Sequence, residues 1–183
     1  RQALCRRCAV WVVMHTLADK EVDRDRALWA AERELAALEG VHGWFATSDP
    51  TASELASRLG QTSGRFFSPG TDGSRVSHDG PAFSLLSVGH LIPRKGHDRL
   101  ISALAKLQDI DWSLRIVGST ERDSVWAQSL VTLRDDLGLT ARIEFVGECS
   151  QEDLEREYAQ AGVLLHTPHY EAYGMVLTEA LAR

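Results

Sequence analysis

The chain has 183 residues, of which 44% are hydrophobic and 25% charged, and its net charge is −6. This is an ordinary globular composition with room for one sizeable domain or two partial ones, and the acidic balance argues against general nucleic-acid binding. No run approaches the roughly eighteen apolar residues that a membrane span needs, and three cysteines cannot all pair, so we expect a cytoplasmic protein.

The first part of the chain alternates apolar runs with helical patterns. The expected elements are strands at 10–15, 43–48 and 65–68, a helix at 24–38, and a short helix that Asp49 and Pro50 cap and begin. The following segment, 69–81, is rich in Gly, Ser and Asp and has no apolar period, which is typical of a linker.

Beyond this segment the alternation restarts. The expected strands are 83–88, 112–117, 142–146 and 162–167, and the expected helices are 96–107, 121–137, one capped by Ser150, and a last one whose apolar face is Val176, Leu177, Ala180 and Leu181. Continuous apolar strands separated by helices indicate βαβ units and parallel sheets. We therefore predict an α/β fold with a first domain at 1–68, a linker at 69–81 and a second domain at 82–183.

Inward helical positions are predicted from the apolar spacing. They are Leu100, Leu104 and Leu107 in one helix, Trp126, Leu130, Leu133 and Leu137 in the next, and Leu154 and Tyr158 in the third. Three of the strands end in glycine, at Gly89, Gly118 and Gly147. Glycine at a strand end is common in turns, but it also lets a ligand or loop approach the backbone, and ligands of parallel sheets bind at this edge.

Near the end of the chain, Glu171 and Glu179 stand eight positions apart, where a loop gives way to a helix. Free backbone N–H groups at such a junction favour phosphate, and carboxylates accept hydrogen bonds from sugar hydroxyls. A nucleotide-sugar contains both kinds of group. The stretch therefore favours a nucleotide-sugar as ligand.

An ordered set of motifs in this sequence resembles family 4 (group 1) glycosyltransferases. The motifs are Ser87-Val88-Gly89-His90-Leu91, Arg94-Lys95-Gly96, Ile116-Val117-Gly118, Phe145-Val146-Gly147, Glu171-Ala172-Tyr173-Gly174 and Glu179-Ala180-Leu181-Ala182, preceded by Val13-Met14-His15 and Pro69-Gly70-Thr71-Asp72. The resemblance implies a GT-B fold with two Rossmann-like parallel-sheet domains, both partial here. Because residue 1 is Arg and the chain stops inside a helical pattern, we expect a fragment truncated at both ends.

The resemblance also implies roles for the phosphate-binding residues. Lys95 would meet the donor diphosphate, helped by His90 or Arg94 and by N–H groups near Gly174 and Met175. His90 stands where many relatives carry Arg, so either Arg94 supplies the missing charge or His90 binds as imidazolium and makes the activity pH-sensitive. The residues themselves also allow a solvated surface Lys95 and a structural His90.

Glu171 would face the transferred sugar, Glu179 the ribose, and His15 the cleft next to the sugar, which makes His15 and Glu171 the candidate catalytic residues. Each could instead be an ordinary loop acid, helix acid or strand-end histidine. The activity that the resemblance implies is the transfer of a sugar, with retention of its anomeric configuration, from a nucleotide-diphosphate sugar to an acceptor. The acceptor is unknown and could be a sugar, a lipid-linked molecule or a small molecule. Neither a cofactor nor nucleic acid is expected, while peripheral membrane association of the full protein is possible.

Other interpretations stay open. Cys5 and Cys8 form a CxxC with no second half for a zinc site, and His166 and His169 bracket Pro168 without a clear third metal ligand, so we predict no metal. A sugar-nucleotide epimerase or a nicotinamide dehydrogenase could use similar sheets, although no GxGxxG occurs. A non-catalytic nucleotide-binding fragment is the third alternative. The base, the sugar and the acceptor are not determined by the sequence.

Overall fold

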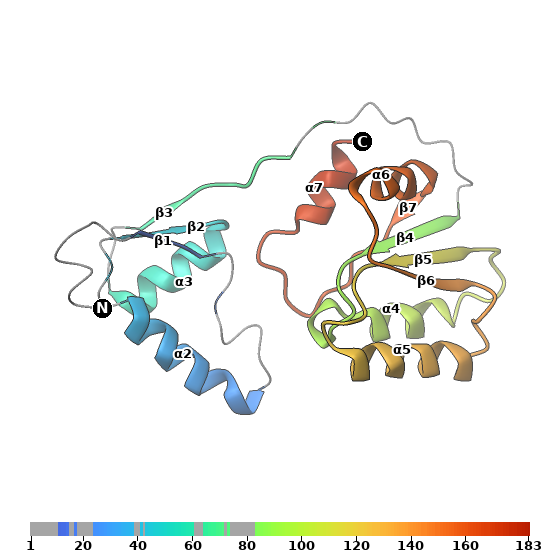
Figure 1. Cartoon of the computed structure of the whole chain (residues 1–183), viewed down its shortest axis with the longest axis horizontal. Coiled ribbons are helices and arrows are strands. Elements are labelled where there is room, and N and C mark those ends of the chain that lie inside the picture. Colours follow the sequence, from blue (N-terminus) through green and yellow to red (C-terminus); the bar gives the residue numbers. More distant parts are fainter. Residues whose placement is uncertain are drawn as a thin grey trace. The chain divides into compact units, whose positions relative to one another are not determined.

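The computed structural model describes residues 11–14, 17, 24–38, 41, 43–60, 64–71, 73 and 83–183 of the chain. The chain divides into two compact units, up to Gly70 and from Thr71 onward (Figure 1). Within the described residues no helix is both long and apolar enough to cross a membrane.

The first unit contains a three-stranded parallel sheet. Its elements are β1 (Trp11–Met14), α2 (Arg24–Leu38), β2 (Gly43–Ala46), α3 (Asp49–Leu59) and β3 (Arg65–Phe66), with strand order β1-β2-β3. Trp44 and Leu55 are buried at its core. The helix cap differs from the expected one: Ser48, not Asp49, caps α3 by accepting a hydrogen bond from the Thr51 N–H.

The second unit is a four-stranded parallel sheet between two layers of helices. Its elements are β4 (Ser84–Val88), η2 (Pro93–Lys95), α4 (His97–Leu104), β5 (Ser113–Val117), α5 (Ser124–Asp136), β6 (Ile143–Gly147), α6 (Gln151–Gln160), β7 (Val163–Leu164) and α7 (Met175–Leu181). The strand order is β6-β5-β4-β7. Helices α4 and α5 lie on one face of the sheet, and α6 and α7 on the other (Figure 1).

Side-chain periodicity explains this layering. Along β5, Leu114 and Ile116 face the α4–α5 core, whereas Val117 packs with Tyr158 on the opposite face. Leu130 of α5 is 1% exposed, as its helical position predicts. The parallel sheets predicted from the sequence are confirmed.

Two predicted helix faces are wrong in part. Leu107 lies three residues beyond the end of α4 and is 45% exposed, because the helix stops at Leu104 and the chain turns there. Leu177 and Leu181, four residues apart on α7, are also exposed, because this helix packs on the sheet through Ala180. Apolar spacing identified these residues as a face but did not determine which face meets the sheet.

Candidate functional site

In the second unit, the direction in which successive strands are added to the parallel sheet reverses between β4 and β7. The chain runs outward from β4 to β5 and β6, and then returns to place β7 on the other side of β4. Loops that follow β4 and β7 therefore leave the same edge of the sheet on either side of this point. Ligands of open parallel sheets bind at the carboxyl ends of the strands at such a switch point.

Hydrogen bonds join these two loops to each other. The guanidinium of Arg94 donates to the Tyr170 carbonyl at 3.1 Å, and the His169 N–H donates to the Arg94 carbonyl at 2.8 Å. The Thr167 hydroxyl donates to the Gly96 carbonyl at 3.0 Å. Segments more than 70 residues apart in sequence thus form one polar structure at the end of the sheet.

Gly96 allows the two loops to lie this close. It has a φ of +67° between η2 and α4, and a Cβ atom there would be 2.1 Å from the carbonyl oxygen of Thr167. Any side chain would therefore clash with backbone and require a disfavoured conformation. Lys95, the last residue of η2, directly precedes Gly96, so the close contact of Gly96 with Thr167 also restricts the backbone position of Lys95.

Lys95 points to the loop that follows β7. Its Nζ atom lies 2.6 Å from Oε2 of Glu171, and the side chains of the pair are 14% and 22% exposed. The Nε2 atom of His166, whose side chain is 9% exposed, lies 3.3 Å from the same oxygen. The structure thus brings together Lys95 and Glu171, two residues that the sequence assigned to one site.

Glu171 is held in its charged form by this environment. Contact with His166 lowers the pKa of Glu171 most. Lys95 and Arg94 lower it further, whereas partial burial raises it, and the resulting pKa is about 2. The carboxylate is therefore ionised at neutral pH. It partly neutralises the Lys95 ammonium.

Two further histidines lie close in sequence to Lys95, with His90 in the loop after β4 and His97 at the start of α4. Burial, with a contribution from nearby Lys95, lowers the pKa of His97 to about 4, so this imidazole is neutral at pH 7. His97 is 2% exposed, and its Nδ1 atom has no hydrogen-bond partner among the described residues. The Nδ1 atom of His90, two residues after β4, is also buried without such a partner.

Glu179 is held by a hydrogen bond from helix α6. It lies on α7, which begins at Met175 directly after Gly174, and its Oε2 atom accepts a 2.9 Å hydrogen bond from the Tyr158 hydroxyl of α6. The sequence predicted that Tyr158 is buried, and at 8% exposure it is. It did not predict that its hydroxyl contacts a candidate site residue.

Other predicted features have mixed outcomes. His15, Cys5 and Cys8 lie outside the described residues. Among those described, no group of three His, Cys, Asp or Glu side chains is placed to hold a metal ion. The expected close approach at strand-end glycines is present at Gly118, where a Cβ would be 2.1 Å from the Gly89 carbonyl oxygen.

His166 was missed as a neighbour of Glu171, because only the loop conformation brings these residues together.

A separate hollow of about 550 Å³ lies against β5 and β6. The charged residues that line it include Arg134 and Arg142, which are already bonded to Asp135 and to the Ile110 carbonyl. None of the predicted site residues lines it.

A known protein family matches the second unit of the chain. The family described as "Glycosyl transferases group 1" matches residues 74–183, which is more than half of the chain. The chain belongs to this family. The match covers the whole switch-point site, including Lys95, Glu171 and Glu179.

Curated relatives of this chain carry transferase or synthase names. The D-inositol 3-phosphate glycosyltransferase of Mycobacterium sp. (strain KMS) is 35% identical over 96 residues, which are 52% of this chain and 21% of the relative. The mannosylfructose-phosphate synthase of Agrobacterium fabrum is 31% identical over 104 residues, 54% of this chain and 23% of the relative. The chain thus spans about a fifth of the length of these relatives.

Solved structures share the fold. The sucrose-phosphate synthase (tll1590) of Thermosynechococcus elongatus has a TM-score of 0.78 and 25% identity, covering 98% of this chain and 50% of its own. Anabaena Alr3699/HepE, solved in complex with UDP and glucose, has a TM-score of 0.79 and 20% identity, covering 100% of this chain and 55% of its own. These similarities confirm the predicted GT-B fold.

Proposed function

We propose that the protein is a retaining glycosyltransferase that moves a sugar from a nucleotide-diphosphate sugar to an acceptor. The observation that carries the proposal is the meeting of Lys95 and Glu171 at the switch point of the sheet, 2.6 Å apart. A cation for the diphosphate and a carboxylate for sugar hydroxyls are the two groups that such a donor needs side by side.

Lys95 would bind the diphosphate. Its present partner is Glu171, so the phosphate would take over or share the ammonium and leave Glu171 available to the sugar. Negative charge builds up on the nucleotide diphosphate as it departs, and a fixed cation at that point lowers the barrier. In this proposal Arg94 or His90 supplies further donors, and the N–H groups near Gly174 and Met175 contact the phosphates.

The two glutamates would divide the rest of the donor. Glu171 would orient the sugar and Glu179 would accept hydrogen bonds from the ribose. His15, which lies outside the described residues, stays a proposed catalytic residue. No cofactor besides the donor is required in this scheme, because protein cations neutralise the leaving group. The complex of the similar Anabaena protein with UDP and glucose supports this class of donor.

The location and acceptor are also proposals. We infer a cytoplasmic enzyme whose acceptor is a sugar, a lipid-linked molecule or a small molecule presented by the first domain. A lipid-linked acceptor would bring the complete protein to the membrane surface as a peripheral protein.

A donor screen on the intact protein tests the proposal. UDP-, GDP- and ADP-sugars are offered with candidate acceptors, and the anomeric configuration of the product is read by NMR; retention is expected. Lys95→Ala should lower kcat/KM for the donor at least about tenfold, equivalent to ~1.4 kcal/mol. The matched control is Lys106→Ala, which removes an exposed lysine just beyond α4 and should change nothing.

Different failures have different meanings. Binding of a nucleotide without transfer would favour a non-catalytic module, and conversion of the donor sugar without transfer would favour an epimerase. Activity that requires added nicotinamide would favour a dehydrogenase. Unchanged turnover in Lys95→Ala would show that the diphosphate binds elsewhere.

A further inference from the structure

We propose that Tyr158 is a positioning residue that orients the carboxylate of Glu179 for the ribose of the donor. This inference rests on the proposed function, in which Glu179 binds the ribose. It assigns a new role to α6, which carries none of the residues that the sequence placed in the site.

The contact between the two side chains is direct. The Tyr158 hydroxyl donates to Oε2 of Glu179 at 2.9 Å, from a ring that is 8% exposed. Burial, then the contact with Glu179, raises the pKa of Tyr158 above its ordinary value, so the phenol keeps its proton and stays a donor. Within the described residues no hydrogen bond reaches Oε1 of Glu179, which leaves that oxygen for a ligand.

Arg183 contacts both Tyr158 and Glu179. Its guanidinium lies 4.6 Å from the centre of the Tyr158 ring, and it donates to the backbone carbonyl of Glu179 at 2.6 Å. It also pairs with Glu155 of α6, with Nε and Oε2 2.8 Å apart. Both the backbone and the side chain of Glu179 are therefore attached to α6.

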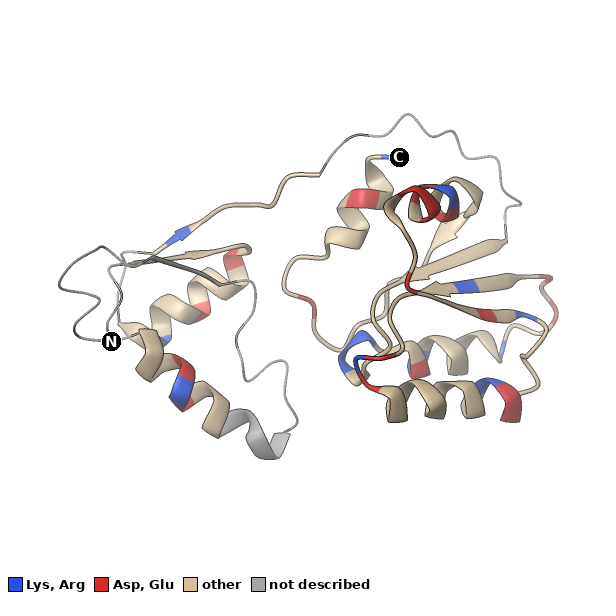
Figure 2. Cartoon of the chain, viewed as in Figure 1, with Lys and Arg blue, Asp and Glu red and all other residues tan. Residues whose placement is uncertain are grey.

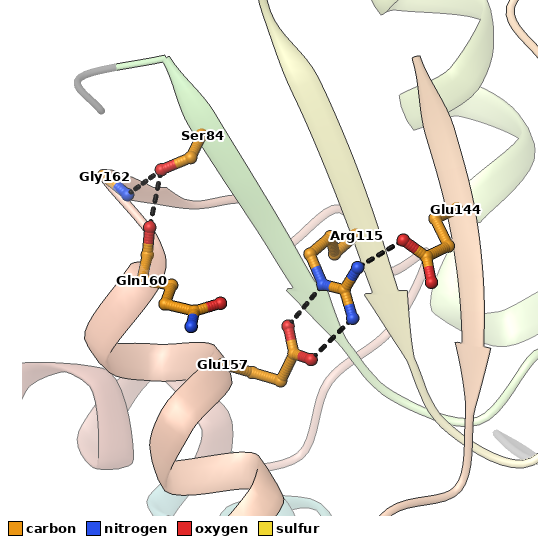
Figure 3. A network of polar contacts seen from close by, with 6 residues as sticks. All are labelled: Ser84, Arg115, Glu144, Glu157, Gln160 and Gly162. Atoms are coloured by element: carbon orange, nitrogen blue, oxygen red, sulfur yellow. Dashed lines mark hydrogen bonds and ion pairs between the residues drawn. The ribbon is translucent and has the colours of Figure 1, made fainter. Parts of the chain in front are cut away.

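Helix α6 is in turn attached to the sheet. Glu157, the neighbour of Tyr158, accepts two hydrogen bonds from Arg115 of β5, at 2.7 and 2.8 Å (Figure 3). Arg115 also pairs with Glu144 of β6. Figure 2 shows a basic band on β5, an acidic band on β6 and a mixture of acidic and basic residues on α6.

A second attachment lies at the end of the helix. The Ser84 hydroxyl of β4 donates to the Gln160 carbonyl at 2.7 Å and accepts from the Gly162 N–H at 2.9 Å (Figure 3). Because α6 is tied to β4 and β5, the phenol has a fixed position relative to the carboxyl edge of the sheet. A carboxylate bonded to it loses rotational freedom before the ligand arrives, which favours binding.

The test is Tyr158→Phe in the intact protein, which removes only the hydroxyl. The probes are the nucleoside diphosphate that the wild-type protein binds and its 2′,3′-dideoxy counterpart, with affinities measured by calorimetry. We expect the preference for the ribose form to fall about fivefold. The donor KM should rise with little change in kcat, because ribose contacts are the same in the ground and transition states.

Two further variants separate positioning from general loosening of the helix. Glu152→Gln removes an exposed charge of α6 that pairs with Arg156 but keeps the hydroxyl and the Arg115 attachment, so it should leave the ribose preference unchanged. In a Glu179→Ala background, Tyr158→Phe should have no further effect on that preference.

The inference is overturned if Tyr158→Phe keeps the wild-type ribose preference, or weakens both nucleotides equally while lowering the melting temperature. It is also overturned if the loss persists unchanged without the Glu179 carboxylate. Failure of the proposed function is seen separately and earlier: a wild-type protein that binds no nucleotide refutes both.

Discussion

Replacing Gly96 by alanine should destabilise the protein more than the same change at Gly138. Both glycines have left-handed backbone, with φ of +67° and +69°, and both follow the end of a helical segment. Their surroundings differ. A Cβ at Gly96 would lie 2.1 Å from the Thr167 carbonyl oxygen, whereas a Cβ at Gly138 would have no neighbour within 4 Å.

The magnitudes follow from these contacts. Left-handed backbone costs an alanine about 1–2 kcal/mol at either position. At Gly96 the loops must also move apart by more than ~1 Å to reach ordinary contact. That movement breaks the 3.0 Å bond from Thr167 to the Gly96 carbonyl and the 2.8 Å bond from His169 to the Arg94 carbonyl. At about 1 kcal/mol each, these losses bring the total for Gly96→Ala to about 3–4 kcal/mol.

Urea unfolding and calorimetry of the intact protein measure the difference between the two variants, with Gly138→Ala as the matched control. Calorimetry is included because two units need not unfold together. Nucleotide binding should weaken only in Gly96→Ala, because that change moves Lys95. Equal destabilisation by the two substitutions would refute the close approach of the loops.

Two further predictions concern stability. Leu130→Ala should lower the free energy of unfolding by about 2–5 kcal/mol, because the Leu130 side chain is 1% exposed in the core. Val125→Ala on the same helix should lower it by less than about 0.5 kcal/mol, because Val125 is 82% exposed. Urea unfolding of both variants measures the two changes. His97 has a pKa of about 4 when folded and 6.5 in the unfolded chain, so the unfolded state binds its proton first as the pH falls. The free energy of unfolding should therefore fall by about 3 kcal/mol as the pH is lowered from 6.5 to 4. His97→Gln should flatten this part of the plot of unfolding free energy against pH. An unchanged slope in that variant would contradict the lowered pKa of His97.

Local patterns were sufficient for the architecture of the second unit. Alternating apolar strands and amphipathic helices predicted its parallel sheet, and Ser150 caps α6 as expected, with its hydroxyl accepting from the Asp153 N–H. Such features depend on residues close together in the chain, so their spacing is visible in the sequence. Helix ends were less certain, as Leu107 shows, because the chain leaves α4 at Leu104 and turns toward β5.

The motifs around Lys95, Glu171 and Glu179 were recognisable from the sequence, but the bonds that fix them were decided by tertiary structure. Lys95 and Glu171 are 76 positions apart and meet because β7 returns to pair with β4. Similarly, Tyr158 reaches Glu179 because α6 and α7 cover the same face of the sheet. Periodicity fixes which side of an element is apolar, whereas strand order and helix placement determine which polar side chains meet, and these arise only when the whole sheet is packed.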